Sequence, residues 1–387
     1  MSVEFAKRVK ELPPYLFVTI DKMKKMALKK GVDLIDLSIG DPDIPTPKHI
    51  VWKMKKAVEK VEHHRYPSYE GMFSFRQAVA HWYKKRFKVS LNPEIEVLSL
   101  IGSKEGIGHI PFAFINPGDV ALVSSPGYPV YPIATPFAGG ISYEMPLLKK
   151  NKFLPDLKAV PKGVLRKAKI MFINYPNNPT TAVADKDFYR DVVQFAGKNN
   201  IIVCHDAAYS EIYYDSRKPL SFLQIPGARD VGIEFHSLSK TFNMTGWRIG
   251  FAVGNEKVIS GLGKIKSNLD SGIFQAIQEA GIEALKTKEA VLTNIRNTYR
   301  ERRDILYKGL KDTGLELEKP EATFYLWVKV PKGFDSASFV GHLLNKAGVL
   351  ATPGNGFGDP GEGYVRFTLT IETKRIKEAV ERIKKIL

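Results

Sequence analysis

One short segment, residues 237–250, concentrates side chains that could do covalent and phosphate chemistry. It reads SLSKTFNMTGWRIG, in which Lys240 stands between two hydroxyl-bearing residues. Ser237, Ser239 and Arg248 could donate hydrogen bonds to one phosphate, the arginine as a bidentate fork. A cation beside Lys240 would lower the pKa of its amine and favour the neutral, nucleophilic form. An exposed lysine among turn serines is the plainer alternative, so other segments must decide between the two.

Polar residues also follow three apolar segments that are expected to be strands. After VLSLI the chain reads GSKEG, a small-residue turn opening a helix whose free N–H groups could bind a phosphate. Asn178 follows IMFI, while Asp206 and Tyr209 follow IIVC. Each feature alone fits a plain turn, loop or helix cap. Ligands of open α/β sheets bind beyond the carboxyl ends of the strands, so these residues are expected to converge.

The converging set contains a phosphate cradle, an amine, a carboxylate, a phenol and an amide. Pyridoxal 5′-phosphate (PLP) needs a lysine for its Schiff base and an acid that keeps its pyridine nitrogen protonated, because only the pyridinium is a strong electron sink. The sequence therefore predicts PLP as the cofactor, and no metal site.

Short β-rich runs alternate with amphipathic helical patterns, which is typical of an α/β protein with a mostly parallel sheet. A terminal helix is expected from the spacing of Ile376, Val380, Ile383 and Leu387. We expect an N-terminal arm and part of a small domain over 1–45, a large domain over 46–285 and a small C-terminal domain over 286–387. The predicted strands are 97–101, 120–123, 170–173, 201–204, 232–235, 249–253 and 364–370.

The stretch from Val120 to Tyr143 carries no charge and is long enough to span a bilayer. Its four prolines and several glycines should break any helix, so we expect a buried strand followed by turns. The N-terminus lacks the apolar core of a signal peptide, and a single cysteine, Cys204, excludes an internal disulfide framework. A cytoplasmic location without membrane partners is therefore expected.

A net charge of +17 raises the question of nucleic-acid binding. The lysines lie on the polar faces of amphipathic patterns and form no aromatic-interleaved stripe, so we expect a solvated, lysine-rich surface and no nucleic-acid partner. Heat adaptation, or attraction of small anionic substrates, would account for the same charge.

Three motifs, NYPNNPT, HDAAYSE and SLSKTFNMTGWRIGFAVG, occur here in the order and spacing of a known family. With LSIGDPD, YPSYEG, SSPGYPVY, PGNGFG and YVRFTLT they span nearly the whole chain, which resembles the class I/II aminotransferases of the fold type I PLP enzymes. The resemblance implies a large PLP-binding domain around a mostly parallel sheet and a smaller α+β domain.

The resemblance also implies roles for individual residues. Lys240 would form the Schiff base and move a proton between the substrate α-carbon and cofactor atom C4′. Asp206 would pair with the pyridinium nitrogen, and Tyr209 would bind the phenolic oxygen; these three are the predicted catalytic residues. Asn178 would share the phenolic oxygen, and Tyr128 would stack on the ring. The phosphate would be bound by Ser103, Lys104, Ser237, Ser239 and Arg248, and by Tyr66 of the partner subunit in a homodimer with two shared active sites.

For the substrate, the resemblance implies that Arg366 clamps the α-carboxylate as a bidentate fork, with Gly40 and Asn178 nearby. Tyr15, Tyr69 and Glu70 lie in segments that could reach the distal end of the substrate, although N-terminal packing and dimer contact explain them equally well. Thr181 stands where many relatives carry glycine, so we expect a changed turn without loss of function.

Within the family the sequence motifs are most similar to those of enzymes that exchange an amino group between LL-diaminopimelate and 2-oxoglutarate in lysine biosynthesis. Aspartate, alanine or aromatic aminotransferases of broad specificity remain alternatives because they share most motifs. A PLP-dependent C–S lyase using the same lysine is a further alternative. A regulator with an aminotransferase-like domain is disfavoured, since the 36 residues before LSIG leave no room for a DNA-binding domain.

Overall fold

A seven-stranded sheet forms the centre of the larger part of the protein, described here from a computed structural model that covers residues 2–13, 16–215 and 217–387. The strand order is β2-β8-β7-β6-β5-β3-β4. The strands are β2 (Val97–Leu100), β3 (Val120–Ser125), β4 (Ile141–Pro146), β5 (Ala168–Asn174), β6 (Ile202–Asp206), β7 (Gly232–Ser237) and β8 (Gly250–Gly254).

The strand directions bring most carboxyl ends to one edge of this sheet. β4, β3, β5, β6 and β7 are parallel to their neighbours in turn, whereas β8 is antiparallel to both β7 and β2. β2 therefore points the same way as β7. The mostly parallel sheet expected from the sequence is confirmed, and the six predicted strands within it are all present.

Helices cover both faces of the sheet, because successive strand residues alternate between two apolar clusters. One cluster joins Val203 and Val253 to Phe75 and Val192 of the helices on that side. The other joins neighbouring strand residues such as Phe172 to helices on the opposite face. The first face is covered by α3 (Lys48–Val58), α4 (Phe73–Phe87), α8 (Lys186–Asn199) and α12 (Gln275–Leu285), the second by α5 (Ser103–Phe114), α6 (Val130–Phe137) and α11 (Glu256–Leu269).

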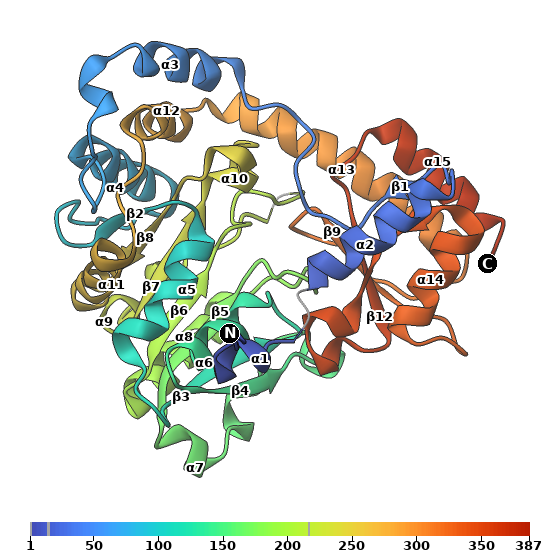
Figure 1. The fold of residues 1–387 in the computed structure, drawn as a ribbon, viewed down its shortest axis with the longest axis horizontal. Helices are drawn as coiled ribbons and strands as arrows, with labels where there is room; N and C mark the ends of the chain where they lie inside the picture. The colour runs from blue at the N-terminus through green and yellow to red at the C-terminus, as the bar shows by residue number, and fades with distance from the viewer. Residues whose placement is uncertain (1, 14–15, 216) are drawn as a thin grey trace.

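The C-terminal elements build a second core around a three-stranded antiparallel sheet, β11-β12-β9. In Figure 1 these elements lie to the right of the seven-stranded sheet, and the long helix α13 (Glu289–Asp312) extends across the top between them. The other elements are β9 (Tyr325–Lys329), β11 (Thr352–Pro353), β12 (Tyr364–Thr368), α14 (Ser336–Ala347) and α15 (Thr373–Lys384). The domain limits at 45 and 285 stay a prediction.

The N-terminal segment belongs to both regions. α1 (Lys7–Lys10) lies near α6, whereas α2 (Leu16–Lys29) lies over the C-terminal elements in Figure 1. β1 (Ile35–Asp36) pairs in parallel with β10 (Val349–Leu350), so a strand near the N-terminus hydrogen-bonds to one in the C-terminal region.

The proline-rich segment after β3 contradicts its prediction. Turns were expected there, but α6 occupies Val130–Phe137 and β4 follows at the sheet edge. Pro132 lies in the first turn of this helix, where its missing N–H costs nothing, and only Pro136 lies near the end. Within the described residues, no helix combines the length and apolar character needed to cross a bilayer.

Candidate active site

Five strands deliver chemical groups to the same edge of the large sheet. β2, β3, β5, β6 and β7 all end there, and β8 begins there. Leu100 at the end of β2 and Ser237 at the end of β7 both pair with Gly250 of β8. Ser103, which opens α5, and Arg248, which precedes β8, are therefore brought close to Ser237.

A cavity of about 230 Å³ lies at this edge, between the two regions of the chain. Nine of the predicted site residues line it: Gly40, Ser103, Tyr128, Asn178, Asp206, Tyr209, Ser237, Lys240 and Arg366. The structure thus gathers residues separated by more than 300 positions in the sequence. Six of the nine follow ends of predicted strands, whereas Gly40, Tyr128 and Arg366 were expected from the resemblance.

Lys240, at the end of the short helix α10 (Leu238–Thr241), directs its amine into the cavity. Its Nζ donates a hydrogen bond of 2.9 Å to the carbonyl oxygen of Gly40. The pKa of Lys240 is lowered to about 8, mainly by burial and also by the guanidinium groups of Arg366 and Arg248, against the opposing charge of Asp41. Neighbouring cations contribute as the sequence suggested, but burial is the larger cause.

Asp206 ends β6 and is almost fully buried. Its Oδ2 accepts a hydrogen bond of 2.8 Å from the hydroxyl of Tyr131, and its Oδ1 accepts one of 3.2 Å from the N–H of Ala208. Burial raises the pKa of Asp206, although both hydrogen bonds act in the opposite direction. The carboxyl group is thus anchored from behind and open toward the cavity.

Arg366 on β12 is 1% exposed, and burying a cation carries a large desolvation free energy. Its Nη1 donates to Asn178 Oδ1 and its Nη2 to the carbonyl oxygen of Ser38, both at 2.7 Å. The guanidinium lies 4.1 Å from the ring centre of Tyr325 and 4.7 Å from that of Phe357, and its Nε has no hydrogen-bond partner among the residues that the structure describes. A buried guanidinium without a carboxylate partner is suited to an anionic ligand.

Two polar residues of the cavity were missed by the sequence reasoning. Tyr325 on β9 bonds the hydroxyl of Tyr209 at 2.9 Å. Asn174 donates to the carbonyl oxygen of Asp206 at 2.7 Å and accepts from the N–H of Asn178 at 2.8 Å. Asn174 ends β5 and could have been found by the strand-end rule, whereas nothing in the local sequence marks Tyr325.

The proposed phosphate ligands fall into two groups. Ser103 and Ser237 line the cavity, and Ser239 is buried next to it with its N–H bonded to Ser237 Oγ. Arg248 is exposed and donates to the carbonyl oxygens of Ile101 and Thr245. Lys104 lies on the exposed first turn of α5.

Glycine is required where Arg248 crosses the turn before α5. Gly102 has a φ of +110°, and a Cβ there would lie 2.4 Å from an Nη atom of Arg248. A side chain at position 102 would therefore displace the guanidinium from the turn that opens α5.

Other predicted residues lie apart from the cavity within this single chain. Tyr66 is 92% exposed, and Tyr69 and Glu70 are exposed beside it. Tyr15 lies outside the described residues. Thr181 has a φ of +66°, a conformation that glycine adopts readily, so the turn itself does not require threonine.

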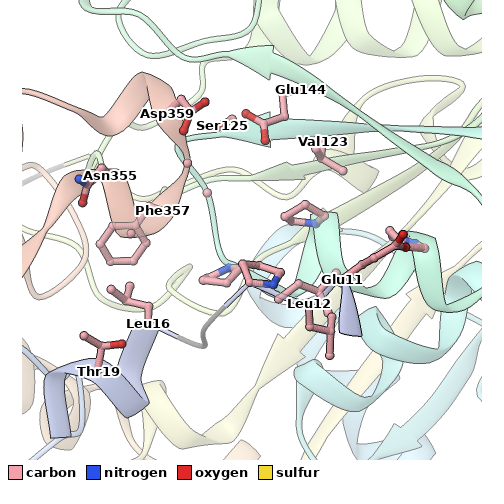
Figure 2. A pocket seen from close by; sticks show the side chains of 18 of the residues that line it. Glu11, Leu12, Leu16, Thr19, Val123, Ser125, Glu144, Asn355, Phe357 and Asp359 are labelled. Atoms are coloured by element: carbon pink, nitrogen blue, oxygen red, sulfur yellow. The ribbon is translucent and has the colours of Figure 1, made fainter. Parts of the chain in front are cut away.

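A larger cavity of about 1330 Å³ lies between the N-terminal segment, α6 and residues 353–359 (Figure 2). Its wall is mostly apolar and includes Leu12 and Leu16, with one carboxylate from Glu11 beside Leu12 and another from Glu144 on β4. The lysine, the buried aspartate and the buried arginine described above line the smaller cavity instead. Size therefore does not identify the chemical site here.

The donor set of the smaller cavity fits PLP. It combines a primary amine with a lowered pKa, a buried carboxylate, the hydroxyl of Ser103 at the N-terminus of the twelve-residue helix α5, and the hydroxyl of Ser237 at the end of β7. These are the groups needed by an aldehyde, a pyridine nitrogen and a phosphate on one molecule.

The chain belongs to the family "Aminotransferase class I and II", whose model matches residues 32–383. It is an aminotransferase of fold type I, a class that is in general PLP-dependent and acts on amino acids and 2-oxo acids.

Among proteins with known functions, the chain is 57% identical over 386 residues to the LL-diaminopimelate aminotransferase of Syntrophobacter fumaroxidans, with all of both chains covered. It is 57% identical over 383 residues to the enzyme of the same name from Aquifex aeolicus, covering 99% of each. Among solved structures, apo BacF from Bacillus subtilis superposes with a TM-score of 0.96 at 40% identity, covering 100% of this chain and 99% of the other.

Proposed function

We propose that the smaller cavity binds PLP and that the enzyme is a transaminase in which the Lys240 amine would bind the cofactor's aldehyde carbon. The observation that carries the proposal is the placement of the Lys240 amine and the Asp206 carboxylate in one cavity. When bound, PLP supplies an electron sink for the charge that develops at the substrate α-carbon. Asp206 would hold the proton on the pyridine nitrogen, and Tyr209 and Asn178 would bind the phenolic oxygen.

Lys240 has the properties of the group that moves the proton. With a pKa of about 8, roughly a tenth of its amine is neutral at pH 7, far more than for an ordinary lysine, and the neutral amine can accept a proton from the substrate α-carbon. The carbonyl oxygen of Gly40 holds Nζ at 2.9 Å and so limits its orientations. The same amine would carry the proton to C4′.

The proposed phosphate site lies at the sheet edge where β2 and β7 end and β8 begins. Ser103, Ser237 and Ser239 offer hydroxyl and backbone donors there, while Lys104 and Arg248 supply positive charge at the exposed side. Tyr128 lines the cavity, where its ring could stack on the pyridine.

Arg366 is the proposed ligand of the substrate α-carboxylate. Its present acceptors, the Asn178 amide and the Ser38 carbonyl, are neutral, so a carboxylate would form a stronger, charge-assisted pair. Gly40 and Asn178 line the same cavity as Arg366 and would lie near the bound carboxylate.

The proposed substrates are LL-diaminopimelate and 2-oxoglutarate. Support comes from the full-length identity of 57% to two enzymes that bear the name LL-diaminopimelate aminotransferase. We also propose that Tyr15 is one of the residues that contact the distal end of the substrate.

The test is a set of single half-reactions with the PLP-loaded enzyme. LL-diaminopimelate, aspartate, alanine, glutamate and phenylalanine are added separately, and conversion of the bound cofactor to its aminated form is followed by absorbance. We expect LL-diaminopimelate and glutamate to react fastest. A preference for aspartate, alanine or phenylalanine would show that LL-diaminopimelate is not the amino donor. Release of ammonia with return of the initial spectrum would indicate a lyase instead of a transaminase.

The variant Lys240→Ala tests the proposed mechanism independently of which amino acid is the donor. The variant should lose transamination with every donor by at least about a thousandfold, because both the covalent link and the proton carrier are removed. Full activity in Lys240→Ala would contradict the mechanism whichever donor is preferred.

We further propose a homodimer in which Tyr66 serves the partner's site. Exposed aromatic side chains support this: Tyr66 is 92% exposed, Trp52 62% and Tyr69 50%. In a hybrid dimer of one Lys240→Ala chain and one Tyr66→Phe chain, Lys240 and Tyr66 would both be intact in one site. That site should bind PLP with wild-type affinity, whereas the weakened affinity of Tyr66→Phe would show that Tyr66 acts within its own chain.

A further inference from the structure

Tyr131, which the sequence reasoning did not single out, contacts the carboxyl group of Asp206 from outside the cavity. Its hydroxyl donates a 2.8 Å hydrogen bond to Oδ2, the shorter of the two bonds that this carboxyl group accepts. Tyr131 does not line the cavity itself. It can therefore influence a bound ligand only through residues that do line the cavity, and its hydroxyl acts through Asp206.

The position of the Tyr131 hydroxyl is fixed by packing. The side chain is fully buried, and its ring stacks on Phe172 with centroids 5.3 Å apart and an interplanar angle of 11°. Its ring also meets Tyr128 edge-on at 5.9 Å. Tyr131 thus contacts both the residue placed beside the pyridine nitrogen and the residue placed over the ring.

The hydroxyl is also a permanent donor. Burial and the charge of Asp206 raise the pKa of Tyr131 well above its ordinary value, so the phenol keeps its proton. Asp206 is different, because burial raises its pKa and the hydrogen bond from Tyr131 counters that rise. Lys240 and His205 supply further positive potential, and Tyr209 lies on the cavity side.

We propose that Tyr131 is a positioning residue that keeps Asp206 ionised and aimed at the pyridine nitrogen of the cofactor. The proposal rests on the proposed PLP site. A carboxylate that receives a hydrogen bond from behind has a lower affinity for protons, so the shared proton stays on the pyridine nitrogen. Without Tyr131, Asp206 would tend to take that proton and the ion pair would become a neutral pair.

The test compares Tyr131→Phe with wild type by the PLP dissociation constant, measured by absorbance on dilution of the loaded enzyme between pH 5 and pH 9. Phenylalanine keeps the stack on Phe172 and removes only the hydroxyl. We expect PLP to bind roughly tenfold more weakly, as for loss of one hydrogen bond to a charged group. We also expect the loss of affinity at acid pH to begin about one pH unit higher, because Asp206 must be ionised to bind.

Tyr175→Phe is the matched control. Tyr175 is equally buried, and its hydroxyl donates one 2.9 Å hydrogen bond to the carbonyl oxygen of Phe153. Both variants remove a buried hydroxyl and should lose similar thermal stability, but only Tyr131→Phe should shift the acid part of the profile. The part near pH 8, set by Lys240, should be unchanged in both.

The outcomes separate this proposal from the proposed function. If wild type binds PLP through Lys240 but Tyr131→Phe shows the affinity and pH profile of Tyr175→Phe, Tyr131 has only a structural role and the inference is wrong. If wild type forms no absorbance band that depends on Lys240, the PLP site itself is wrong.

Discussion

Two carboxylates on adjacent strands, Asp206 and Glu234, show how one sheet builds both a reactive site and an inert polar core. Asp206 ends β6 at the cavity. Glu234 lies within β7 and is fully buried under the helices of the other face, beside His205 and His236. His205 directly precedes Asp206, so the alternation of strand side chains sends the two to different surroundings.

Glu234 is saturated with donors. His205 Nδ1 at 2.6 Å and the N–H of Phe222 at 2.9 Å reach Oε1, while the hydroxyls of Tyr83 and Ser221 reach Oε2. Burial alone would raise its pKa, but these bonds and the charge of His205 outweigh it, and the pKa of Glu234 is about 2.

Asp206, by contrast, accepts hydrogen bonds from the Tyr131 hydroxyl and the N–H of Ala208, and its pKa is raised. The difference teaches that burial alone does not mark a functional acid. The carboxylate with spare acceptor capacity beside a cavity can take a ligand, whereas the one with every oxygen occupied can only hold elements together.

The largest effect that tests this comparison is expected from Asp206→Asn. Removing the charge opposite a pyridinium should weaken PLP binding by roughly a hundredfold or more, as for one half of a buried ion pair. The thermal stability of the cofactor-free protein should change little, because an amide relieves a buried carboxyl group with a raised pKa. Wild-type PLP affinity in this variant would remove Asp206 from the site.

Glu234→Gln should give the opposite pattern. Replacing a carboxylate that accepts four hydrogen bonds leaves donors facing an amide and should cost about 3 kcal/mol of unfolding free energy. PLP affinity of the folded variant should stay within about twofold. Chemical denaturation checks this, with Glu316→Gln as a half-exposed control that should lose less than about 1 kcal/mol.

Acid pH should affect the Glu234 cluster in a defined order. Burial lowers the pKa of His236 to about 4. Below pH 6.5 this histidine is therefore protonated in the unfolded chain but stays neutral in the folded chain, so the free energy of unfolding decreases. The stabilising contribution of Glu234 is complete above pH 4.5 and is lost toward pH 2. Unfolding free energy measured from pH 8 to pH 3 should therefore decline from about pH 6.5, and Glu234→Gln should lose the step below pH 4.5.

The smallest effect concerns strain at the rim of the site. Thr181, Asn243 and Arg248 have positive φ in the loops at the strand ends, whereas the residues of the Glu234 cluster do not. Thr181→Gly should stabilise the protein by up to about 1 kcal/mol, because a β-branched residue is strained at a φ of +66°. Thr180→Gly, at ordinary φ, should destabilise it, and equal effects of the two would show that Thr181 is unstrained.

Much of the fold was predictable because its signals are local. Six strands of the large sheet follow from short apolar runs, and the strand-end rule led to Asp206, Ser237 and Lys240. α6 and β4 were missed, since four prolines argued for turns, yet three of them lie before or within the first turn of the helix. Tyr325 and Tyr131 were missed because their partners are 116 and 75 residues away in the sequence.

The sequence by itself determined the reactive groups and their order along the chain, because residue types and strand ends are properties of short segments. The tertiary structure decided the environments: the burial that is the main cause of the lowered pKa of Lys240, the open acceptors of Asp206 and the hydrogen bond from Arg366 to Asn178, 188 residues away. Burial and long-range contacts set these properties, and neither can be read from neighbours in the chain.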